Sequence, residues 1–294
     1  GGAMKLQMDT RIDNYLVESY SEPILPLLAV ADIATTNEDE LVAITELAND
    51  TVTPDTTVSI TQPTHGTTEL NADNTITYTP QANTNGEDSF TYTLTNAVGS
   101  STASVTVTVA PINDTPLISL NNISVETTEG QTVQMSGTYS DIDGDVITLA
   151  ASTGTISLNG NTFTWSYTPN DGPTDSQTIT LTATDLSSAS TTTTFTLTVN
   201  NVAPVITLPQ TLQIFSTDTI HIPGSFIDPG ADPWTAAVNY GDSSPTEALA
   251  VDVNKTFSLD HVYITPGSHT ISVTVTGDDG GVGVAAIEVA TNSV

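Results

Sequence analysis

The sequence contains no cysteine. Disulfide frameworks, thiol catalysis, iron–sulfur clusters and thiolate zinc sites are therefore excluded. In a secreted protein, stability must then come from several hydrophobic cores and from bound metal. The four histidines never show the spacing of a His-Glu-x-x-His helix, and no Gly-x-Ser-x-Gly elbow occurs. The sequence predicts a protein that is not an enzyme.

Basic residues are almost absent. Lys and Arg total 3 against 34 acidic residues, which gives a formal net charge of -31. Nucleic acids and anionic membrane surfaces are excluded as partners, because binding to either depends on Lys and Arg. Self-repulsion of this size destabilises a compact chain unless counter-ions are bound. Many bound divalent cations, or a solution of high ionic strength, would reduce this repulsion.

Long hydrophobic runs are missing as well, and no apolar segment approaches the roughly 20 residues that span a bilayer. At 294 residues the chain is too long for one ordinary core and predicts two or three domains. Threonine makes up about a fifth of the residues, far above ordinary usage, and β-branched residues dominate the apolar set. This composition is typical of an all-β protein.

Apolar and polar residues alternate with a period of two in several segments, which indicates half-buried antiparallel strands. The clearest are residues 90–95, 103–109, 163–167, 195–199 and 271–275. Short linkers rich in Asn and Pro close two of the repeating units, at 111–116 and 200–204. We therefore expect three tandem antiparallel β-sandwiches in an elongated array.

The linkers set the predicted domain boundaries. Residues 1–29 begin like a cloning remnant, and 5–28 are expected to form a short helix, an ordered linker or a disordered segment. The sandwiches are expected at 30–116, 117–203 and 204–294. The chain is expected to be a piece of a larger protein.

Residues 140–145 hold three carboxylates at alternate positions, Asp141, Asp143 and Asp145. Like charges this close repel one another, so a cation among them explains the cluster. Oxygen ligands in a flexible turn favour Ca²⁺. The segment is not an EF-hand, because Val146 and Ser152 stand where that loop needs Gly and Glu. The alternative is a solvated acidic turn between two strands.

Residues 30–116 resemble the cadherin-like tandem repeats of large bacterial surface proteins, on motifs at 36–40, 47–50, 61–66, 77–80 and 86–92. The family usually places an Asp-rich cluster soon after Ala48-Asn49-Asp50, and here that segment is shortened to 51–55.

Residues 117–203 resemble a diverged cadherin-like or immunoglobulin-like unit whose acidic landmarks include Glu126, Glu129 and Asp185. Residues 205–290 resemble a PKD (polycystic-kidney-disease) repeat, on motifs at 224–232, 238–243 and 261–267. The PKD resemblance implies a sandwich, an extracellular setting and no chemistry of its own.

Two pairs of residues share one spacing. Asp114 and Asp141 lie 27 residues apart, and so do Asn201 and Asp228. A shared length of the first hairpin is one explanation. The other comes from the cadherin resemblance, which implies calcium between successive domains. It assigns Glu38, Asn113, Asp114, Asp141, Asp143 and Asp185 to the first junction. It assigns Glu126 or Glu129, together with Asn201, Asp228, Asp232 and Asp278, to the second.

The sequence therefore predicts a non-catalytic, calcium-stiffened stalk or adhesive segment of a large secreted or cell-surface bacterial protein. It is expected to be monomeric and to meet a cell-surface or matrix glycan or protein. The alternative is an accessory carbohydrate-binding region of a secreted polysaccharide-degrading enzyme. That alternative would use Trp165, Trp234 and tyrosines for sugar stacking, whereas burial or packing of both tryptophans is the simpler expectation.

Overall fold

The computed structural model describes residues 26–293, so the helix or linker predicted at 5–28 lies almost wholly outside the described residues. These residues form 23 strands and one short 3-10 helix. The chain divides into two compact units, one ending at Ile112 and one beginning at Asn113. The predicted fold class is confirmed as three tandem β-sandwiches, two of them in the second unit. The boundaries at 29, 116 and 203 remain predictions.

The first sandwich packs a four-stranded sheet on a three-stranded one. The larger sheet has the order β1 (Asp32–Asn37), β7 (Ser100–Ala110), β6 (Gly86–Thr95) and β3 (Thr57–Ile60). The smaller sheet has the order β2 (Val42–Ile44), β5 (Ile76–Pro80) and β4 (Gly66–Leu70). A 3-10 helix, η1 (Glu46–Asn49), follows β2. Phe90, Tyr92 and Leu94 enter the core from β6, and the threonines between them point outward, as predicted.

The second sandwich has two four-stranded sheets. One has the order β12 (Thr155–Asn159), β13 (Thr162–Tyr167), β10 (Val133–Ser140) and β8 (Leu117–Leu120). The other has the order β11 (Thr148–Ala151), β14 (Gln177–Thr184), β15 (Ser190–Asn200) and β9 (Ser124–Thr128). Trp165 lies fully buried between the sheets and meets Phe195 edge-on, and its Nε1 donates to Thr153 O at 2.6 Å. Trp165 is therefore a core residue, as expected.

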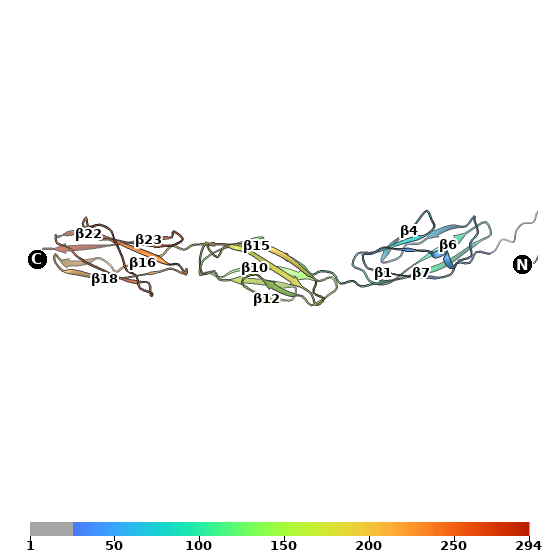
Figure 1. Ribbon diagram of the computed structural model, residues 1–294, viewed down its shortest axis with the longest axis horizontal. Coiled ribbons are helices and arrows are strands. Elements are labelled where there is room, and N and C mark those ends of the chain that lie inside the picture. Colours follow the sequence, from blue (N-terminus) through green and yellow to red (C-terminus); the bar gives the residue numbers. More distant parts are fainter. Residues whose placement is uncertain (1–25, 294) are drawn as a thin grey trace, which may run out of the picture. The chain divides into compact units, whose positions relative to one another are not determined.

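The third sandwich packs a three-stranded sheet on a five-stranded one. Figure 1 labels β16 and β18 of the smaller sheet and β22 and β23 of the larger. The smaller sheet has the order β16 (Val205–Thr207), β18 (Thr219–Ile227) and β21 (Thr256–Val262). The larger has the order β17 (Leu212–Phe215), β23 (Val282–Asn292), β22 (Gly267–Gly277), β19 (Trp234–Asn239) and β20 (Glu247–Ala248). Trp234 packs edge-on against Phe226, and Lys255 Nζ lies 4.3 Å from the centre of its ring.

All three sandwiches share one strand pairing. An early strand of each domain runs parallel to its last strand, in the pairs β1–β7, β9–β15 and β17–β23. The other strand pairs in the described residues are antiparallel. The acidic residues of interest lie in the loops and linkers around these strands. Among the described residues, no helix has the length and apolar character needed to cross a membrane.

Candidate metal centre

In each domain, an acid occupies the loop that follows one particular strand. Glu46 follows β2, Asp141 follows β10 and Asp228 follows β18. These strands are equivalent, because each pairs antiparallel with the third-from-last strand of its domain, which is β5, β13 or β21. Each of the three acids has at least one buried carboxylate oxygen without a hydrogen-bond partner. Buried polar atoms are normally hydrogen-bonded, so these oxygens require an explanation.

The densest acidic cluster lies between the second and third domains. Single carboxylate oxygens of Glu129, Asp171 and Asp232 lie within 4.8 Å of one another. Oxygens of Asp232, Asp278 and Asp279 form a second such group. Asp232 therefore belongs to both groups. Either group has the oxygen donors that Ca²⁺ prefers.

Glu129 links the second domain to the linker that leaves it. The side chain follows β9 and is fully buried. Its Oε1 accepts a hydrogen bond from Val202 N at 2.7 Å, and its Oε2 accepts one from Gly172 N at 2.9 Å. Two backbone donors thus fix this carboxylate where the linker enters the third domain. Of the two predicted alternatives, Glu126 instead accepts from Asn200 Nδ2 on the exposed face of the sheet.

Asp232 is 2% exposed, and both of its oxygens lack a hydrogen-bond partner. A Cβ placed on Gly230 would lie 2.9 Å from Glu129 Oε2 and 3.0 Å from Asp232 Oδ1. A Cβ placed on Gly277 would lie 3.2 Å from Asp232 Oδ2. The two oxygens therefore face different sides, one toward Glu129 and the other toward the end of β22.

Burial is the main reason that the pKa of Asp232 rises to about 6, and the charges of Glu129 and Asp228 add to it. Among residues 26–293, Lys255 is the single Lys or Arg, and it does not neutralise these carboxylates. Lys255 Nζ donates at 2.6 Å to the backbone carbonyl of Asp228 and not to its carboxylate. Asp228 is itself buried, and its Oδ1 accepts from Gly230 N while its Oδ2 has no partner. A buried, uncompensated carboxylate is unfavourable by several kcal/mol, on the order of what cation binding can offset.

The second and third domains also touch through their loops. Ala231 N donates to Asn170 O at 2.8 Å, which joins the loop after β18 to the loop after β13. The predicted ligand Asn201 lies against Gly281 in the turn between β22 and β23, and its Nδ2 is buried without a partner. The acidic cluster therefore lies beside a direct contact of two domains.

The residues predicted for the first junction fall in both units. In the second unit, Asp114 N donates to Asp143 Oδ2 at 2.8 Å, and Asp143 N donates to Asp141 Oδ1 at 2.9 Å. Asn113 Nδ2 donates to Asp185 Oδ2 at 2.9 Å. The linker thus contacts both the 141–145 loop and the turn after β14. Asp145 is half-buried in the same loop.

Glu38 belongs to the first unit. It is 3% exposed, and its Oε1 accepts from Ile112 N at 2.6 Å. Glu38 therefore binds the linker that leaves the first domain, and Glu129 binds the linker that leaves the second in the same way.

Asp171 and Asp279 belong to the cluster but were not predicted. Asp171 lies in the 168–176 loop, which has no periodicity, and Asp279 lies beside the predicted Asp278. An adjacent acid was the one available signal for Asp279.

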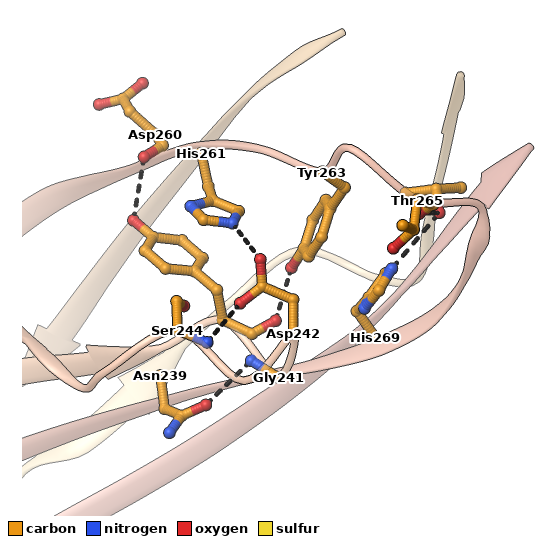
Figure 2. Close-up of polar contacts among 11 residues, drawn as sticks. Asn239, Gly241, Asp242, Ser244, Asp260, His261, Tyr263, Thr265 and His269 are labelled. Carbon is orange, nitrogen blue, oxygen red and sulfur yellow. Dashed lines mark hydrogen bonds and ion pairs between the residues drawn. The ribbon is translucent and has the colours of Figure 1, made fainter. Parts of the chain in front are cut away.

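A second polar cluster, in the third domain, is structural. Figure 2 shows Asp242 between the ring of His261 and the backbone of Ser244. His261 Nε2 lies 2.7 Å from Asp242 Oδ2, and the His261 ring stacks on Tyr240 with centres 4.1 Å apart. Tyr263 OH donates to Tyr240 O at 2.8 Å. The cluster ties β21 to the turn after β19, and His261 therefore has a packing role in this domain.

Comparison with known proteins gives the same domain order. A family model described as a bacterial Ig domain matches residues 22–109 and 113–198, and one described as a PKD domain matches 201–291. No curated protein matches the chain.

Three solved structures illustrate the similar folds. An I-band fragment from titin is 14% identical, with a TM-score of 0.37, and the match covers 91% of this chain and 97% of that one. Protocadherin gamma B2 extracellular cadherin domains 3-6 are 13% identical, with a TM-score of 0.46 and coverages of 92% and 73%. An endo-fucoidan hydrolase from glycoside hydrolase family 107 is 16% identical, with a TM-score of 0.32 and coverages of 90% and 43%.

Proposed function

The chain belongs to the bacterial Ig domain family and carries a PKD domain after its two Ig domains, and we propose that it is a calcium-stiffened stalk or adhesive segment. Both domain types are non-catalytic and typical of extracellular bacterial proteins, although such domains also occur within enzymes.

The observation that carries the proposal is Asp232, which is buried among other acids with both oxygens unpartnered. Glu129 and Asp171 reach it from the second domain, and Asp278 and Asp279 from the third. Without a cation these carboxylates repel one another across the domain contact. With one, ligands from two domains are held together.

Calcium fits this donor set better than other common metals. The donors are all hard oxygens, and the chain has no thiolate to offer zinc or copper. Calcium also accepts the irregular coordination that carboxylates from several loops provide. By mass action, free Ca²⁺ at about one hundred times its Kd would stabilise the bound state by about 2.7 kcal/mol.

The direct test combines thermal melting with small-angle X-ray scattering, in Ca²⁺ and in chelator. We expect Ca²⁺ to raise the melting temperature of the second and third domains and to narrow the distribution of particle dimensions. Unchanged melting and unchanged scattering would reject the calcium mechanism. Mg²⁺ is the matched control for ionic strength, because its small octahedral shell suits this set of loops less well.

A panel of glycans, tested with and without Ca²⁺, separates the stalk from an accessory carbohydrate-binding region. We expect no retention of the chain on any glycan. Trp165 is fully buried, and Trp234 is flanked by Phe226 and Lys255, so neither offers an open stacking face. Specific retention would favour the accessory region instead.

A further inference from the structure

The acids around Asp232 form two groups and not one. Oxygens of Glu129, Asp171 and Asp232 lie within 4.8 Å of one another, and so do oxygens of Asp232, Asp278 and Asp279. Ligand oxygens lie about 2.3–2.6 Å from a Ca²⁺ ion, so two ligands of one ion are at most about 5 Å apart. Each group by itself therefore fits around one ion, and Asp232 is the residue that the two groups share.

The two oxygens of Asp232 face the two groups separately. A Cβ placed on Gly230 would lie 3.0 Å from Asp232 Oδ1 and 2.9 Å from Glu129 Oε2. A Cβ placed on Gly277, the residue before Asp278, would lie 3.2 Å from Asp232 Oδ2. Neither oxygen of this buried side chain has a hydrogen-bond partner. Each group therefore has one unpartnered oxygen of Asp232 on its side.

A single ion would leave most of the negative charge of this cluster unbalanced. The two groups contain five carboxylates, whereas Lys255, the one Lys or Arg among residues 26–293, donates to a backbone carbonyl. One Ca²⁺ supplies two positive charges, and two ions supply four. The groups also act on each other, because loss of water and then the neighbouring Asp171 raise the pKa of the Asp279 carboxyl. An ion in one group alone would leave the other group without a counter-charge of its own.

We propose that this cluster binds two Ca²⁺ ions bridged by Asp232, an inference that rests on the calcium-binding role proposed above. One ion lies between Glu129, Asp171 and Asp232 Oδ1, and it joins the second domain to the third. The other lies between Asp232 Oδ2, Asp278 and Asp279, within the third domain. Asp278 and Asp279 are exposed, so water completes the shell of this second ion. The first ion therefore holds two domains together, and the second holds Asp232 to the turn between β22 and β23.

The alternative is a single ion in the first group, with Asp278 and Asp279 as solvated acids. Replacement of Asp by Asn separates the two cases, because Asn keeps the shape of the side chain and removes its charge. The measurement is the number of Ca²⁺ ions bound per full chain, by equilibrium dialysis at the lowest Ca²⁺ concentration that saturates the unmodified chain. Each variant is compared with the unmodified chain, so ions bound elsewhere cancel.

We expect Asp171→Asn to lose one ion, Asp279→Asn to lose one and Asp232→Asn to lose two. Asp218→Asn, at an exposed acid of the third domain, is the control and should lose none. If the Asp232→Asn chain does not fold, the double replacement of Asp171 and Asp279 by Asn takes its place. The double variant should lose two ions, whereas a one-ion site would lose only one.

The two ions also differ in what they hold, and small-angle X-ray scattering in Ca²⁺ measures this difference. Asp171→Asn should broaden the distribution of particle dimensions, because it removes the ion that joins two domains. Asp279→Asn should leave the distribution close to that of the unmodified chain, because the ion that it removes lies within one domain.

Loss of only one ion from the Asp232→Asn chain would overturn the two-ion proposal and leave the calcium-stiffened junction in place. Retention of all ions by the Asp279→Asn chain would do the same. Loss of no ion from the Asp232→Asn chain would instead reject both the two-ion proposal and calcium binding at this junction.

Discussion

Gly130 of the second domain lies directly against Pro229 of the third. A Cβ placed on Gly130 would be 2.6 Å from the Cβ of Pro229, closer than real side chains approach. Gly130 also has a φ of 71°, which other residues adopt at a cost. The next residue on one side is Glu129, and Pro229 follows Asp228. The close approach of the two backbones therefore brings acids of both domains together.

Replacement of Gly130 by Ala should loosen this contact. The added methyl group would force the two loops apart, and overpacking of this kind typically costs about 1–3 kcal/mol. We expect a broader scattering distribution in Ca²⁺ and weaker Ca²⁺ stabilisation. Gly160→Ala is the matched control. Gly160 also has a positive φ, 57°, but a Cβ there meets no atom within 4 Å. Similar scattering from both variants would mean that the contact does not position the domains.

Replacement of Asp232 by Asn should have opposite effects with and without metal. In chelator we expect unchanged or slightly higher stability, because the change removes a buried charge that has no partner. In Ca²⁺ we expect loss of most of the gain, about 2–3 kcal/mol at saturating metal. Differential scanning calorimetry measures both. The exposed Asp218→Asn is the control, and it should behave like the unmodified chain.

The third domain should lose stability in acid through Asp242. Hydrogen bonds from Ser244 and His261 hold the pKa of Asp242 far below its usual range, against a smaller opposing effect of burial. The stabilisation is therefore complete above the ordinary Asp pKa of about 4 and is lost as the pH falls below it. Asp242→Asn should remove most of this loss of stability at acid pH. It should also lower the free energy of unfolding near neutral pH by about 2 kcal/mol.

The measurement for Asp242 is unfolding followed by Trp234 fluorescence across the acid range. Asp260→Asn is the control, because Asp260 pairs with His221 on the exposed face of β18 and β21. Water screens that pair, so Asp260→Asn should change the loss of stability at acid pH only slightly. If the Asp242→Asn chain lost stability at acid pH as the unmodified chain does, another group would control acid unfolding.

Much of the fold could be predicted from alternation alone. The residues of β6, β13 and β22 that alternate in the sequence are those that enter the cores, because a strand places successive side chains on opposite faces. The equal spacing of Asp114 to Asp141 and of Asn201 to Asp228 also had structural content. Asp141 and Asp228 do follow equivalent strands.

The site could be predicted only in part, because loop paths are not encoded in periodicity. Glu126 and Glu129 were equal candidates in the sequence, yet Glu126 lies on the exposed face of β9, whereas Glu129 lies beyond the strand end and turns inward. Asp171 lies in a loop whose position depends on contacts of its neighbours with Glu129 and Ala231. Glu46 is a single acid between Thr45 and Leu47, and nothing in the sequence signals that its carboxylate is buried without a hydrogen-bond partner.

The parallel pairing of β1 with β7, β9 with β15 and β17 with β23 has a mechanical consequence. In each domain, an early strand lies beside the strand by which the chain leaves, and the two run in the same direction. A pull on the two ends of a domain therefore slides these strands along each other. All the hydrogen bonds of the pair then bear the load together and cannot open one at a time. Each domain should therefore resist unfolding when tension is applied along the chain.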